Sequence, residues 1–124
     1  MTEYLTLDEV LLIHADQIER YGGTHGVRDL GLIDSALSRP RSGYYGSTIE
    51  QAAALWESFA QNHAFLDGNK RTAFAVTYTF LQINGWRIRA GPDETYDFIA
   101  HLYSRQAFVF IHLVEWLHSN TSKA

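Results

Sequence analysis

The sequence predicts an all-α protein in which about six helices surround one buried helix near residues 69–84. Apolar residues recur at spacings of three and four in several stretches, and helix-capping patterns precede some of these stretches. One short stretch, residues 86–89, alternates between apolar and polar side chains instead. Because the chain has 124 residues, 46% of them hydrophobic, we expect a single domain over residues 1–124 that buries one core.

The first expected helix covers residues 7–21. Thr6 and Glu9 form a capping box, in which a hydroxyl and a carboxylate three residues later satisfy the first backbone N–H groups. The glycine pair at residues 22–23 ends the helix, since glycine readily adopts the conformations that terminate one. His14 lies on the apolar face, where we expect a packed, hydrogen-bonded histidine rather than a ligand.

A second, shorter helix is expected after Asp29, whose side chain can cap it, and this helix must end before Pro40. The loop that follows carries Tyr44 and Tyr45 between two glycines. Such a loop is either an exposed turn or a mobile lip that offers aromatic and backbone groups to a partner. The residues of the loop alone do not separate these two interpretations.

Two helices joined by a short break form the expected centre of the protein. Thr48 and Gln51 give a second capping box, and the apolar stripe that follows continues to His63 at the end of the helix. The residues at 67–68 interrupt this pattern. The next helix, residues 69–84, is apolar on nearly all sides, which predicts a buried position.

The remaining part of the chain is expected to contain a short extended segment and two helices. The alternation at residues 86–89 indicates the extended segment. Pro92 suits the first turn of one helix, and the other helix is expected to begin near Gln106. Residues 119–124 are polar and are expected to fray.

The bulk composition limits the classes of function. The net charge is -4 and there are no cysteines, so disulfides and thiolate chemistry are excluded and no direct nucleic-acid binding is expected. No basic segment leads into an apolar run at the N terminus, and no apolar stretch approaches the roughly 18 residues of a membrane span. We therefore expect a soluble cytoplasmic protein without a membrane partner.

The turn that opens the second central helix carries groups suited to an anion. The first turn of a helix presents unpaired N–H groups and the positive end of the helix dipole. Gly68 lets a ligand approach the backbone closely. Lys70 and Arg71 lie in this first turn, which is unfavourable for cations unless an anion is held there. Arg71 can grip a phosphate with two parallel hydrogen bonds, and Lys70 adds a compact charge.

Two further side chains precede this turn. Asp67 supplies a hard oxygen ligand suited to Mg2+ between phosphates. His63 can accept a proton from an attacking hydroxyl near neutral pH. A base, a metal ligand and a charge clamp are the main parts needed to transfer a phosphorus-containing group. Taken singly, each residue also fits a capped helix with surface charges and a core histidine, but the cluster favours the functional interpretation.

The same segment resembles the signature of the Fic/Doc superfamily, H-x-F-x-(D/E)-G-N-G-R-x-x-R, and is most similar to its Doc (death-on-curing) branch. The matching positions are His63, Phe65, Asp67, Gly68, Asn69 and Arg71. Lys70 replaces the second glycine, as in the G-N-K-R-T-A form expected of the Doc branch, and Phe74 stands where Fic enzymes have their last arginine. The resemblance extends over at least residues 6–90.

This resemblance implies an all-α Fic/Doc domain and a toxin of a type II toxin–antitoxin module. It also implies a protein kinase that transfers the γ-phosphate of ATP, with Mg2+, to a hydroxyl of a translation factor similar to elongation factor Tu. Carried over by position, His63 is the catalytic base, Asp67 is the Mg2+ ligand, and the phosphates are bound by Gly68, Asn69, Lys70 and Arg71. Residues 41–47 correspond to a flap that aligns the target, which favours a binding role for Tyr44 and Tyr45.

The two departures from the signature favour phosphate transfer over nucleotide transfer. By this resemblance, Lys70 fills space where Fic enzymes seat the α-phosphate, and Phe74 removes a clamp for the other phosphates. Phe65 is expected to turn its side chain into the core and fix the loop. No glutamate is followed by glycine or asparagine, so the inhibitory motif of many Fic proteins is absent. Control is therefore expected in trans, from a cognate antitoxin whose tail folds on the toxin.

The sequence leaves four functions open. A Doc-type toxin kinase is favoured, and the main alternative is a Fic-type adenylyltransferase that moves AMP to a target hydroxyl. A non-catalytic binding module with the same fold is a third. An RNA-cleaving toxin is the fourth, and the acidic net charge of -4 argues against it.

Overall fold

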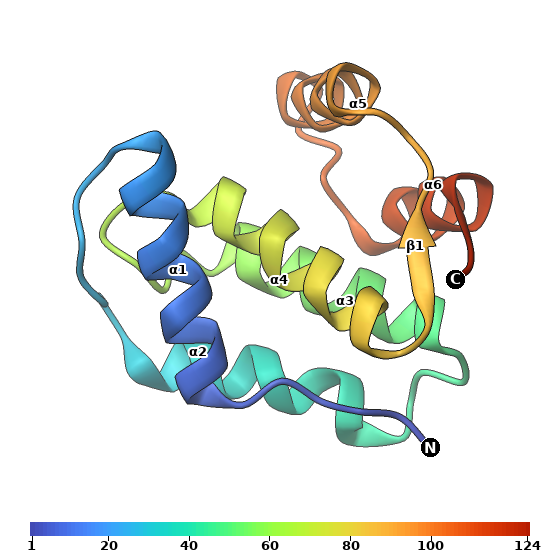
Figure 1. The fold of residues 1–124 in the computed structure, drawn as a ribbon, viewed down its shortest axis with the longest axis horizontal. Coiled ribbons are helices and arrows are strands. Elements are labelled where there is room, and N and C mark those ends of the chain that lie inside the picture. Colours follow the sequence, from blue (N-terminus) through green and yellow to red (C-terminus); the bar gives the residue numbers. More distant parts are fainter.

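The computed structural model describes residues 1–124 and confirms the all-α fold. Helices make up most of the chain, and the single small sheet has two strands (Figure 1). The elements in chain order are α1 (Leu7–Tyr21), α2 (Leu30–Ser38), the 3-10 helix η1 (Arg39–Ser42), α3 (Thr48–Gln61), α4 (Asn69–Ile83), β1 (Trp86–Ile88), α5 (Pro92–Ser104), α6 (Phe110–Asn120) and β2 (Thr121–Lys123). None of the helices combines the length and the apolar composition that a membrane crossing requires.

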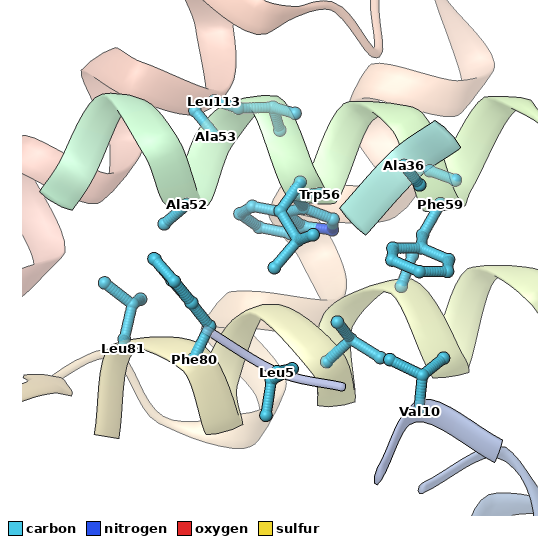
Figure 2. Packing of buried hydrophobic residues seen from close by; sticks show 14 of the residues in the cluster. Leu5, Val10, Ala36, Ala52, Ala53, Trp56, Phe59, Phe80, Leu81 and Leu113 are labelled. Atoms are coloured by element: carbon cyan, nitrogen blue, oxygen red, sulfur yellow. The ribbon is translucent and has the colours of Figure 1, made fainter. Parts of the chain in front are cut away.

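The helices α3 and α4 lie side by side, in antiparallel directions, at the centre of the molecule (Figure 1). Trp56 of α3 is fully buried, and its ring contacts the aromatic side chains of Phe74, Phe98, Phe108 and Trp116. Figure 2 shows Val10 of α1 and Leu113 of α6 in the same core. On α4, Tyr78 and Ile83 remain 44% and 43% exposed. The helix α4 therefore shares the centre with α3 and is not enclosed on all sides.

Local sequence signals start the helices largely where we expected. Thr6 and Glu9 form the predicted capping box at α1, and Asp29 caps α2. The cap of α3 is Ser47 and not Thr48, because the Ser47 hydroxyl accepts the hydrogen bond from a backbone N–H of the first turn and Thr48 is already helical. Helix starts follow from contacts within four residues, which is why sequence patterns find them.

The C-terminal region differs from the prediction in two places. Gln106 has a left-handed backbone, with φ of 54°, so α6 begins later than expected, at Phe110. The tail that was expected to fray is ordered instead: β2 pairs with β1 in antiparallel register, with Thr121 opposite Ile88. Thr121 is 8% exposed. Backbone pairing and this burial hold a segment whose polar composition suggested disorder, whereas the extended segment predicted at β1 is confirmed.

Candidate active site

The loop between α3 and α4, residues 62–68 (the site loop), is held against the loop between α1 and α2. Backbone hydrogen bonds join the two loops: the N–H of Arg28 donates to the carbonyl of Ala64 at 2.8 Å, and the N–H of Leu66 donates to that of Gly26 at 3.1 Å. These bonds satisfy backbone polar groups of both loops, which have no partners within a helix. The site loop is therefore a fixed platform and not a free turn.

Side chains from both sides set the shape of the site loop. The ring of His14, 4% exposed, stacks on Phe65 at 3.9 Å between centroids, and its Nε2 lies 2.8 Å from the carbonyl oxygen of Asp67. Because a carbonyl only accepts, Nε2 carries the proton. The side chain of Asn69 bonds both the N–H and the carbonyl of Phe65, each at 3.0 Å. The predicted packed histidine and the inward turn of Phe65, 2% exposed, are confirmed.

His63 does not continue the apolar stripe of α3, contrary to the prediction. The helix ends at Gln61, and His63 is an exposed residue with a left-handed backbone, φ 51°. The left-handed residue ends the helix, and Arg28 binds the chain at this point: its guanidinium donates to the carbonyl oxygens of His63 at 2.7 Å and of Asn62 at 3.2 Å. The imidazole of His63 forms no hydrogen bond or ion pair. Its ring nitrogens are thus free to meet a substrate.

The N terminus of α4 is open. Its capping residue, Gly68, has φ of 75° and supplies no side chain, and the first bond of the helix runs from the N–H of Thr72 to the carbonyl of Gly68 at 2.9 Å. The three N–H groups before Thr72 have no acceptor, and they belong to Asn69, Lys70 and Arg71. Unpaired N–H groups at the positive end of a helix dipole form an anion-binding site.

Asp67 is ionised beside this open end. Its carboxylate accepts hydrogen bonds from the N–H groups of Thr24 at 3.0 Å and Gly68 at 2.8 Å. These two bonds hold the pKa of Asp67 below its usual range, and the bond from Thr24 has the larger effect. No group of three or more acidic, histidine or cysteine side chains gathers here. A single carboxylate suits Mg2+, which usually takes one or two from the protein and completes its shell with phosphates and water.

The two cations of the turn differ in how they are held. Arg71 donates to the carbonyl of Gly22 at 2.7 Å, and the neighbouring Gly23 leaves room for it, since a Cβ there would lie 3.2 Å from the Arg71 guanidinium. The ammonium of Lys70 lies 4.2 Å from the centre of the Tyr103 ring. Neither cation forms an ion pair with a carboxylate. Lys70 therefore has no counter-ion within the protein, whereas the charge of Arg71 also helps to lower the pKa of the nearby Asp67 without forming an ion pair.

The two tyrosines of the predicted flap lie far from the site loop along the chain of α3. Tyr44 and Tyr45 precede α3, and the 14 residues of that helix place this loop about 20 Å from His63 along the helix axis. Tyr44 is 84% exposed, whereas the Tyr45 hydroxyl accepts a hydrogen bond from Arg39 at 2.7 Å. The structure brings together the six predicted residues from His63 to Arg71 and leaves these two tyrosines at the other end of α3.

Sequence reasoning missed two residues that shape this site. Arg28 fixes the backbone of His63, and Tyr103 lies under Lys70. In the sequence, Arg28 was covered only by the general resemblance to the Fic/Doc superfamily. The charge of Arg28 does not indicate a backbone partner 35 residues away. Tyr103 sits on an ordinary apolar helix face, so nothing in its spacing marks it.

The helical fold and the loop at the open end of α4 define a class of protein, and comparison with known families agrees. A sequence profile of the Fic/DOC family matches residues 4–81, more than half of the chain. The chain belongs to the Fic/DOC family.

Two curated relatives point to the Doc branch. The chain is 48% identical over 98 residues to Toxin Doc of Mycolicibacterium smegmatis, a match that covers 75% of this chain and 73% of the relative. It is 32% identical over 94 residues to Protein kinase doc of Escherichia phage P1, covering 73% of this chain and 75% of that protein. The predicted resemblance to the Fic/Doc superfamily and to its Doc branch is confirmed.

Proposed function

We propose that this protein is a Doc-type toxin that acts as an ATP-dependent protein kinase. It transfers the γ-phosphate of ATP to a hydroxyl of a translation factor similar to elongation factor Tu, in the cytoplasm, and so halts translation. One observation carries the proposal: an uncapped helix N terminus with two cations that form no ion pair lies beside a histidine without a partner and an ionised aspartate. The similarity to a phage protein kinase supports the same reaction.

His63 is the general base in this proposal. Its imidazole has no partner in the protein, and histidine is the side chain that most often acts as a general base in enzymes. The neutral ring accepts the proton of the target hydroxyl as the oxygen attacks phosphorus. His63 is exposed, and Arg28 binds its backbone carbonyl, so the ring is accessible to a second protein.

The turn after the site loop binds the phosphates. The N–H groups of α4 and the side chains of Lys70 and Arg71 provide donors and positive charge. Asp67 would hold Mg2+, which when bound neutralises phosphate charge and orients the transferred group. The side chain of Asn69 is engaged with the backbone of Phe65, so its contribution here is to shape the loop and to offer its own N–H.

A cognate antitoxin is the second partner that we propose. The name of the mycobacterial relative describes a toxin, and toxins of this type are made with a neutralising protein. No glutamate of this chain is followed by glycine or asparagine, so the chain carries no inhibitory motif of the Fic type. Neutralisation in trans by a folded tail of the antitoxin accounts for control of the site.

The test is phosphate transfer with ATP labelled separately at the α and γ positions. Purified protein is incubated with Mg2+, each labelled ATP and elongation factor Tu, and the target is analysed for label. We expect γ-label on the target, and we expect His63→Ala to abolish it. His118→Ala is the matched control, because His118 is also exposed but lies on α6, away from the site.

Each other outcome replaces the proposal with a named alternative. Label from the α position identifies an adenylyltransferase. RNA degradation without nucleotide identifies an RNA-cleaving toxin. If neither label is transferred and His63→Ala remains as toxic to cells as the wild type, the protein is a non-catalytic binding module.

A further inference from the structure

The helix α5 lies outside the residues matched to the family, 4–81, yet one of its side chains reaches the phosphate turn. The ring of Tyr103, in the last turn of α5, lies under the ammonium of Lys70, at 4.2 Å from Nζ to the ring centre. A cation within about 6 Å of an aromatic face is attracted by the ring. A helix beyond the matched range thus contacts the proposed phosphate site.

The Tyr103 ring is itself held in place. It stacks on Phe108 at 4.5 Å between centroids, with an interplanar angle of 16°, and Phe108 packs edge-on against the buried ring of Trp56 at 5.6 Å. The phenol oxygen is buried and has no hydrogen-bond partner. Burial raises the pKa of Tyr103 to about 12, so the ring remains a neutral phenol. A row of three rings therefore connects Lys70 to the core of α3.

The Tyr103 ring is the one partner of the Lys70 ammonium in the protein. Lys70 forms no ion pair, and its side chain is among those with the most rotamer freedom. Arg71, one residue later, is instead fixed by the carbonyl of Gly22. Without Tyr103, the ammonium of Lys70 would have no partner that keeps it beside the open N terminus of α4.

We propose that Tyr103 is a positioning residue for Lys70: its ring holds the ammonium next to the open end of α4 and thereby raises the affinity for nucleotide phosphates. The proposal rests on the proposed function, because it assumes that this turn binds the phosphates of ATP. It adds α5, through one aromatic face, to the parts of the protein that determine phosphate affinity.

Two variants separate the ring from the hydroxyl. Tyr103→Phe keeps the aromatic face, and we expect the Kd for Mg·ATP, measured by calorimetry, to stay at the wild-type value. Tyr103→Leu keeps apolar bulk without the face, and we expect the Kd to rise about two- to fivefold, as loss of an exposed to partly buried cation–π contact predicts. In the Lys70→Met background, the same Tyr103→Leu change is expected to have no further effect.

This double-mutant comparison distinguishes positioning from a general loosening of α5, which would weaken binding whether or not Lys70 is present. A second measurement does not depend on nucleotide. In the free protein the ε-methylene protons of Lys70 should show an upfield ring-current shift in the NMR spectrum, which Tyr103→Phe retains and Tyr103→Leu removes.

The outcomes separate this inference from the proposed function. If the wild type binds Mg·ATP and Tyr103→Leu binds it equally well, the positioning role is refuted and the kinase proposal stands. The same conclusion follows if Tyr103→Leu lowers the affinity as much in the Lys70→Met background as in the wild type. A missing ring-current shift also refutes the positioning role. If the wild type binds no nucleotide, both proposals fail, whatever the spectrum of Lys70 shows.

Discussion

Replacing His14 by phenylalanine tests whether one buried hydrogen bond fixes the site loop. The substitution keeps an aromatic ring stacked on Phe65, where the centroids are 3.9 Å apart, but removes the donor that lies 2.8 Å from the carbonyl oxygen of Asp67. Leaving a partly buried carbonyl without a donor costs about 1–2 kcal/mol. For a domain of this size that loss lowers the melting temperature by about 4–8 °C.

The assay is thermal and urea unfolding of His14→Phe, with the concentration of Mg2+ that gives half-maximal phosphate transfer as a second measurement. We expect lower stability and a higher Mg2+ requirement, because the loop that carries Asp67 loses its anchor. Thr121→Val is the control: it removes a buried hydroxyl whose bond to the carbonyl of Leu117 is 2.6 Å long, at the other end of α4. A His14→Phe protein that melts within about 1 °C of the wild type would refute the reasoning.

Two further predictions concern the same loop. Two backbone N–H groups hold the pKa of Asp67 below its usual range. The stability that they provide is therefore present above about pH 4, the pKa of the unfolded chain, and is lost as the pH falls through the lower pKa of the folded protein. The free energy of unfolding of Asp67→Asn should depend less on pH in that window than that of the wild type. In Gly23→Ala, the added Cβ would lie 2.8 Å from the Asp67 carboxylate, so we expect it to be less stable in urea by about 1–3 kcal/mol. The control is Gly22→Ala, which also has a positive φ, 86° against 123° for Gly23, but nothing within 4 Å of the added Cβ. Equal losses in the two variants would show that the close approach does not matter.

The parts of the fold that sequence predicted are those determined by neighbours along the chain. Periodic apolar residues placed the helices, and the Thr6 and Asp29 caps marked two starts correctly, because a cap involves only the first turn of its own helix. The segment from His63 to Arg71 was found for a similar reason: its charges lie within nine residues, and a helix start gives them a common direction.

Contacts between distant segments explain what could not be predicted. The backbone of His63 after α3 is bound by the guanidinium of Arg28, 35 residues away. The ordered tail depends on pairing with β1, and polar composition carries no information about that partner. The Lys70 contact with Tyr103 depends on how the end of α5 lies against the start of α4. Local patterns report propensity, whereas these features depend on tertiary packing.

The turn after α4 forms hydrogen bonds with residues near both ends of the chain. The Asn84 side chain bonds the N–H and the carbonyl of Glu3, at 2.8 and 2.9 Å, and the N–H of Ala124 donates to the carbonyl of Gly85 at 2.8 Å. Fraying of either end thus starts at the same place, and α4, with 15 residues, puts about 22 Å between that place and the site loop. Amide hydrogen exchange should therefore be fast around this turn while the site loop stays protected, so the ends can open without disturbing the proposed phosphate site.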